Sequence, residues 1–159
     1  LQYTMRATEA SSLADLEAKV GDCFLAGAVA TGCDYSVEQT EPMYDALKPD
    51  PWLADTVRAE MTRLGRSPAE REFEAAHPLG STDMGNVTQL LPGIHPMVAV
   101  EAGGASLHQP DFAAAAIGPS ADKAVIDGAI MLARTVVRLA ESPDERDRVL
   151  AALGHRARL

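Results

Sequence analysis

The chain has 159 residues, of which 47% are apolar and 23% charged, as is ordinary for a globular protein. Its formal net charge of −9 argues against a nucleic-acid-binding protein, because such proteins carry basic patches. No apolar run approaches the ~20 residues that a membrane-spanning helix needs. Aromatic residues make up only 4%, so we expect a core of aliphatic side chains built around helices.

Residues 1–40 predict a strand, a helix and a second strand. Apolar and polar side chains alternate over residues 1–7, which is typical of a half-buried strand. Ser12 is expected to begin the helix and Gly32 to end it, and residues 33–40 predict the second strand. The apolar face of this helix is predicted to consist of Leu13, Leu16, Val20, Phe24 and Ala28. A unit of this size cannot bury a core of its own. We therefore expect partner strands from polypeptide that precedes Leu1.

The rest of the chain predicts four helices and one buried strand. A proline-rich linker over residues 41–51 leads into the first of these helices, and residues 97–102 predict the strand. The longest helix has a narrow polar stripe, so we expect it to be packed on most of its surface. The helices are expected from Asp50–Pro51 to Gly65, from Ser67–Pro68 to His77, from Ser120 to Ala140 and from Ser142 to Gly154.

Two polar loops flank the predicted strand at 97–102. An α/β sheet usually places its functional site under loops at strand ends, although such loops can also be purely structural. The first loop holds Ser81, Thr82, Asp83, Asn86 and His95, and the second holds Ser106 and His108. The chain contains no HxH, HExxH or GxSxG motif. Any metal site would therefore need ligands from elsewhere.

The sequence GSTDMGNVTQLLPGIHP at 80–96, followed by HQPDF at 108–112, resembles the aminoacylase/carboxypeptidase family of co-catalytic metallopeptidases. It most resembles the aminoacylase-like amidohydrolase branch, which includes dipeptidases and N-acyl amino acid hydrolases. The resemblance implies an α/β fold. Residues 1–42 would form half of a ferredoxin-like α+β lid or dimerisation domain, and residues 43–159 the C-terminal part of a zinc-exopeptidase-like catalytic domain.

The same resemblance implies two divalent metal ions. Zinc is the expected metal, and manganese is the alternative. One ion polarises the amide carbonyl, and metal-bound water is deprotonated near neutral pH. His108 matches the last histidine ligand of the family. The remaining ligands and the glutamate that acts as general base lie upstream in the family, so no residue of this chain is assigned to those roles.

The loop at 80–96 matches the family loop that lines the substrate pocket. Ser81, Thr82, Asp83 and Asn86 are therefore candidate substrate contacts, although Asp83 could instead be a helix N-cap. His95 could contact substrate or be a satisfied loop histidine.

Arg6 matches a region in which the family places an arginine against the substrate carboxylate, a pairing that suits a guanidinium. The alternative is a surface arginine. We interpret His77 and His155 as structural or surface residues.

The sequence thus predicts a metal-dependent hydrolase of amide bonds in N-acyl amino acids or dipeptides. The alternative is a non-catalytic dimerisation or ligand-binding α/β module. We expect a homodimer formed through the lid, with no nucleic-acid or membrane partner. Cys23 and Cys33 lack the spacing of a metal site, and we expect them to be buried, reduced thiols in a cytoplasmic protein.

Overall fold

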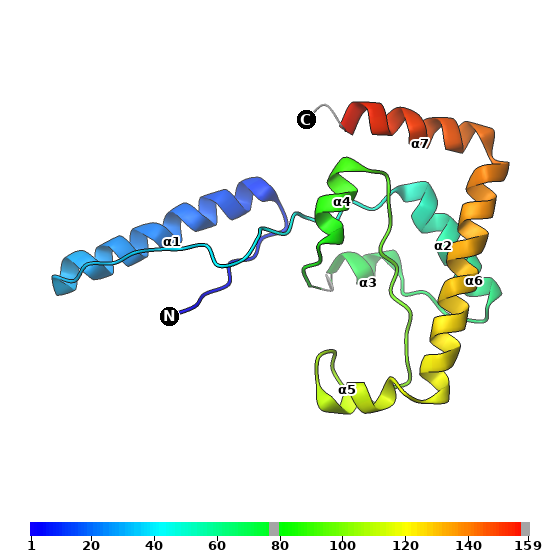
Figure 1. Ribbon diagram of the computed structural model, residues 1–159, viewed down its shortest axis with the longest axis horizontal. Helices are drawn as coiled ribbons and strands as arrows, with labels where there is room; N and C mark the ends of the chain where they lie inside the picture. Colours follow the sequence, from blue (N-terminus) through cyan, green and yellow to red (C-terminus); the bar gives the residue numbers. More distant parts are fainter. Residues whose placement is uncertain (77–79, 157–159) are drawn as a thin grey trace.

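A computed structural model describes residues 1–76 and 80–156 of the chain (Figure 1). The described residues form helices and no strand, so the expected α/β fold with half of a ferredoxin-like domain is wrong. The helices are α1 (Ala10–Thr31), α2 (Pro51–Arg63), α3 (Arg71–Ala76), α4 (Met84–Leu90), α5 (Pro110–Ala115), α6 (Pro119–Glu141) and α7 (Pro143–Arg156). Among the described residues, no helix is long and apolar enough to cross a membrane.

The three predicted strands are extended segments without a ladder. A strand exists only when its backbone N–H and C=O groups pair with a neighbouring strand, and alternation of side chains does not supply that neighbour. Residues 97–102 were expected to be buried, but their side chains alternate: Val98 and Val100 are half-buried while Met97 and Ala99 are exposed. Their backbone bonds to side chains instead: Arg66 Nη1 donates to the Ala99 carbonyl at 2.9 Å.

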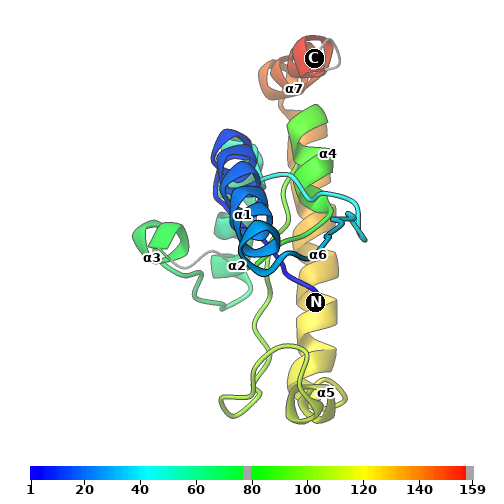
Figure 2. The same ribbon diagram turned by 90° about the vertical axis from the view of Figure 1, so that its left-hand side faces the viewer.

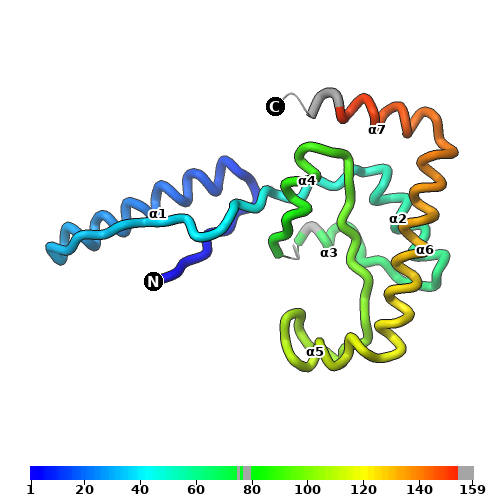
Figure 3. Tube along the Cα trace, viewed as in Figure 1, coloured from blue at the N-terminus to red at the C-terminus, as the bar shows by residue number. Residues whose placement is uncertain are grey.

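Helix α1 extends away from the remaining helices, with the N-terminal segment and residues 33–40 beside it (Figures 1 and 3). It begins at Ala10, two residues before the predicted start, and ends at Gly32, whose φ of 69° is the left-handed conformation of a helix C-cap. The rings of Tyr3 and Phe24 lie 5.5 Å apart. The predicted apolar face is half-buried, and it consists of Leu13, Leu16, Val20, Phe24 and Ala28. No residue of α1 is fully buried.

The core lies between α2 and α6, which pack side by side (Figures 1 and 2). Asp50 caps α2 as predicted, since its carboxylate accepts a hydrogen bond from the Leu53 N–H at 3.1 Å. Val57 and Met61 of α2 meet Met131 of α6, and Leu64, Ile94 and Val98 pack against them. The extended segment after α4 therefore closes one side of the α2–α6 pair.

The polar stripe of α6 faces α2, and its Lys123 and Arg134 side chains stay partly open to solvent. Asp127 is buried and pairs with Arg66 at 2.8 Å and with Lys123. On the other side of the helix, Val125 and Val136 are 70% and 68% exposed. The expectation that α6 is packed on most of its surface is therefore wrong for the described chain. The pair between Asp127 and Arg66, which no hydrophobic pattern predicts, joins this face of α6 to the residues that follow α2.

A bidentate ion pair between Arg148 and Asp50 joins helix α7 to the start of α2. Arg148 donates from Nη1 and Nη2 to the two carboxylate oxygens of Asp50 at 2.9 and 3.0 Å. Burial by itself would raise the pKa of the Asp50 carboxyl, but hydrogen bonds from Arg148 and from the backbone of Leu53 outweigh burial and lower it. The Lys123 hydrogen bond, with that of Arg66, likewise lowers the pKa of Asp127 against the opposing effect of burial.

These two carboxylates make the protein sensitive to acid. A carboxyl whose folded-state pKa is lowered stabilises the fold fully above its unfolded-state pKa, about 4 for aspartate, and loses that contribution as pH falls through the folded-state value. As pH is lowered below about 4, we expect the urea concentration at the unfolding midpoint of wild type to decrease. The midpoint of Asp50→Asn should decrease less over the same pH range. Asp22→Asn, at an exposed position of α1, is the control. Identical acid profiles for wild type and Asp50→Asn would contradict the assignment.

Candidate functional site

The glycine-rich motif at 80–96 is mostly loop, as its composition predicted, but it contains one short helix that was not predicted. Residues 84–90 form helix α4, whose side chains bind the backbone of the segment at 43–48. Asn86 Oδ1 accepts from the Asp45 N–H at 3.0 Å, and its Nδ2 donates to the Met43 carbonyl at 3.1 Å. One turn later, buried Thr88 accepts from the Lys48 N–H at 2.9 Å. Side chains of α4 thus form hydrogen bonds with backbone groups of the 43–48 segment.

Gly85 is the point of closest approach in this contact. A Cβ built on Gly85 would lie 1.8 Å from the backbone oxygen of Asp45, where no side-chain atom can fit. The motif therefore needs glycine at this position for packing. Gln89 completes the contact by donating from Nε2 to the Ala46 carbonyl at 2.7 Å. Sequence reasoning missed this clamp, because Thr88 and Gln89 look like ordinary polar residues of a loop.

The predicted substrate contacts of the first loop differ in their surroundings. Ser81 and Asp83 are exposed, and Asp83 occupies the N-cap position of α4 without capping any backbone N–H. Thr82 Oγ1 accepts from the Met84 N–H at 3.3 Å. Asn86 uses both ends of its amide on the 43–48 segment. Ser81 and Asp83 thus present side chains to solvent, whereas Asn86 holds the chain together.

His95 and Arg6 are also exposed. His95 lies on the extended segment that connects α4 with α5, and Arg6 lies on the N-terminal segment before α1. Figures 1 and 2 show α4 and α5 at opposite ends of that connecting segment, so the two predicted loops do not meet in the described chain. Of the other histidines, His77 lies outside the described residues and His155 lies in α7.

His108 has an unusual backbone. Its φ is 63°, and among the described residues it is the only non-glycine residue with a positive φ. Such conformations cost free energy and cluster at functional sites, where the surrounding structure holds them. Gln109 follows as the N-cap of α5, and Pro110 takes the first helical position. The turn before α5 thus presents His108.

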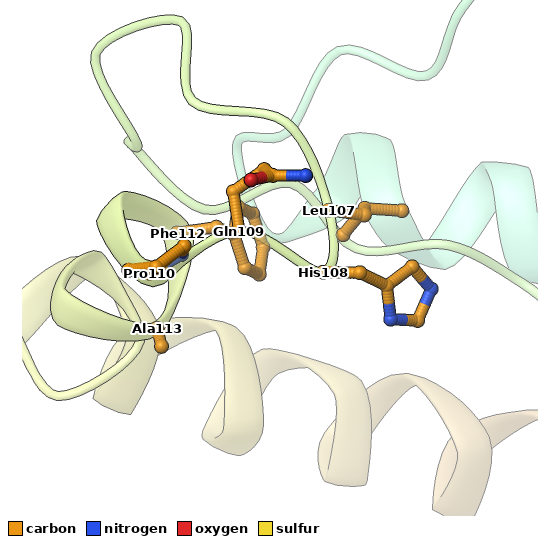
Figure 4. Close-up of a pocket in the computed structure, with 6 residues that line it drawn as sticks. All are labelled: Leu107, His108, Gln109, Pro110, Phe112 and Ala113. Atoms are coloured by element: carbon orange, nitrogen blue, oxygen red, sulfur yellow. The ribbon is translucent and has the colours of Figure 1, made fainter.

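A hollow of about 520 Å³ opens beside His108. Leu107, Pro110 and Phe112 make its lining mainly apolar. Figure 4 shows the imidazole ring of His108 pointing away from the α5 residues, with both ring nitrogens free of them. The side chain is exposed, so its nitrogens are accessible to a ligand.

The described residues do not by themselves fit a two-metal centre. No group of three or more His, Cys, Asp or Glu side chains that could hold a metal ion occurs among them. Glu101 and Asp111 are exposed, as is His108. His108 therefore stays a predicted ligand, and the described chain supports no reaction step through a metal.

Comparison with known proteins gives two relatives. The Xaa-Arg dipeptidases of Mus musculus and Homo sapiens are 36% and 34% identical to this chain over 96 residues. The aligned part covers 60% of this chain and 22% of each relative, so the chain spans about a fifth of their length. No family model and no solved structure matches. The chain is thus similar to peptidases, and this similarity does not single out the aminoacylase branch.

Proposed function

We propose that this chain is part of a metal-dependent hydrolase that cleaves amide bonds in dipeptides or N-acyl amino acids. Two findings support the proposal: the similarity to Xaa-Arg dipeptidases and the motif pair at 80–96 and 108–112. The observation that carries it is the left-handed backbone of His108, because strain of this kind is retained where a side chain must be aimed.

In this proposal His108 is the last ligand of a site for two divalent ions, zinc or manganese. The other ligands and the glutamate base come from polypeptide other than the residues described. Exposed Ser81, Asp83 and His95 remain available to substrate. Thr82 and Asn86 would act mainly by shaping α4.

The proposed role of Arg6 is to bind the substrate carboxylate, since an exposed guanidinium offers a fork of N–H donors that matches a carboxylate. No other residue of the N-terminal segment offers this chemistry.

Residues 1–42 are proposed to form part of the lid and to make a homodimer, and residues 43–159 to belong to the catalytic unit. The support is the isolation of α1, which has no fully buried residue and leaves Leu25 and Val29 exposed. Apolar surface of this kind is normally covered by a partner. Cys23 and Cys33 are free thiols that are exposed rather than buried as expected, and free thiols suit a reducing cytoplasm.

The alternative is a non-catalytic dimerisation or ligand-binding module. One observation favours it, namely that no three-donor metal group occurs in the part of the chain that the structure describes. Metal content separates the two functions. A purified protein with two bound ions per chain supports the hydrolase, and a protein with none supports the module.

The direct test compares the 159-residue chain with the product of its complete open reading frame. Both are assayed with zinc or manganese against a panel of dipeptides, including Xaa-Arg peptides, and N-acyl amino acids. We expect turnover only from the complete product, because hydrolysis needs a metal-activated water, a base and several ligands in one place. Metal-dependent turnover by the 159-residue chain alone would show that the catalytic residues have been misplaced. Absence of both metal and turnover in the complete product would contradict the proposed function.

A further inference from the structure

A buried carboxylate on α2 gathers three guanidinium groups. The side chain of Glu60 is fully buried, with 0% of its surface exposed. Its oxygens pair with Arg138 Nε at 2.6 Å, Arg63 Nη1 at 2.9 Å and Arg134 Nη1 at 3.5 Å. One guanidinium would suffice to neutralise one carboxylate. Three against one leave a surplus of two positive charges on a chain whose formal net charge is −9.

These arginines line a hollow of about 350 Å³ between α2 and α6. Their side chains are 57%, 52% and 39% exposed for Arg63, Arg134 and Arg138, so each fork is partly open to solvent. Ala133 and Val137 supply an apolar part of the lining. Glu141 also lines the hollow, and counting it with Glu60 still leaves three positive charges against two negative.

The outer nitrogens of this arginine cluster (Arg63, Arg134 and Arg138) remain available as donors. Arg63 and Arg134 each donate to Glu60 from Nη1, and Arg138 forms an ion pair with it through Nε. Within the part of the chain that the structure describes, the Nη2 groups of Arg63 and Arg134 and the Nη groups of Arg138 have no bonded partner. Glu60 thus fixes the position of three forks and leaves their remaining N–H groups free for another acceptor.

We propose that the arginine cluster binds a small oxyanion, a phosphate or carboxylate group with two or more acceptor oxygens. Guanidinium forks bind such groups through paired, charge-assisted hydrogen bonds. Glu60 is a positioning residue in this site, because it anchors the arginines and would not contact the ligand. The site uses none of the residues assigned to the proposed hydrolase, so it stands or falls independently of that function.

The test is a titration of the protein with sodium phosphate and, separately, with sodium acetate at constant ionic strength set by sodium chloride. Arginine Nε–H signals in NMR spectra report binding at individual side chains. We expect saturable shifts of Arg63, Arg134 and Arg138, with affinity weakened about tenfold in Arg63→Gln and in Arg134→Gln. In either variant Glu60 keeps two cationic partners, so the carboxylate is not left unpaired.

Two controls distinguish anion binding at the arginine cluster from a nonspecific effect of positive charge. Arg146→Gln removes the same charge from an exposed position on α7 and should leave affinity unchanged. Arg134→Lys keeps the charge but loses the fork, so its affinity should lie between those of wild type and Arg134→Gln. Binding of phosphate alone or acetate alone identifies which oxyanion the site takes. Saturation by neither anion, or equal affinity in wild type and both glutamine variants, would overturn the proposal.

Discussion

Gly85→Ala is expected to destabilise the protein by about 3 kcal/mol, the upper end of the usual cost of overpacking. The added methyl group would lie 1.8 Å from the backbone oxygen of Asp45 and 2.8 Å from its carbonyl carbon. Both contacts are with main chain, which cannot rotate out of the way as a flexible side chain would. The 43–48 segment must therefore move off α4, and the hydrogen bonds of Asn86 and Thr88 are lost with it.

Gly27→Ala is the matched control for this variant. Gly27 lies inside α1 with nothing within 4 Å of the position that a Cβ would take. Alanine is the better helix former by up to about 1 kcal/mol, so this variant should be slightly more stable than wild type. Urea unfolding midpoints measure both. A Gly85→Ala variant as stable as wild type would mean that α4 does not pack against residues 43–48.

His108→Asn is expected to reduce turnover by at least about a hundredfold in the product of the complete reading frame. In metalloenzymes, loss of a residue that only hydrogen-bonds to a metal ligand already costs about 10–100-fold, so loss of the ligand itself should cost at least as much. Asparagine tolerates the left-handed conformation that His108 adopts, with φ of 63°. The variant therefore removes the imidazole without adding backbone strain. If His108 is a ligand, metal analysis should show one ion fewer per chain.

Two further variants distinguish ligation from structure. His108→Gly relieves the strained backbone, so thermal stability should hold or rise while metal and turnover are lost. Ser106→Ala changes a neighbouring exposed residue and should leave metal content and rate unchanged. Full metal content and normal rate in His108→Asn would remove the central assignment. Loss of thermal stability without loss of metal would assign His108 a structural role.

The positions of the four longer helices followed from local sequence, because helix ends depend on residues within a few positions of one another. Helix α3 begins at Arg71, later than the expected start at Ser67–Pro68, and α4 and α5 were not predicted. Asp50 and Pro51 start α2 as predicted, and Gly32 ends α1 in a left-handed turn. The predicted start of the longest helix at Ser120 lies one residue from the observed Pro119. The apolar face of α1 was also predicted, since a period of 3.6 residues needs no knowledge of the partner.

Tertiary contacts decided the features that depend on residues far apart in the chain. Residues 97–102 alternate like a strand, but no neighbour supplies a ladder, so they bond to Arg66 and Ser120 instead. The covered face of α6 carries the ion pairs made with Glu60 of α2 and with Arg66, which follows α2.

The candidate site divides in the same way. His108 was singled out from its motif, but its left-handed backbone became visible only in the structure, because φ is set by how the turn before α5 is held. The clamp of Asn86 on Met43 and Asp45 joins residues about forty positions apart, a separation at which local pattern carries no information. Sequence alone thus determined the positions of the four longer helices, α1, α2, α6 and α7, and it singled out His108 and the motif at 80–96. The fold determined which faces are covered and which polar groups meet.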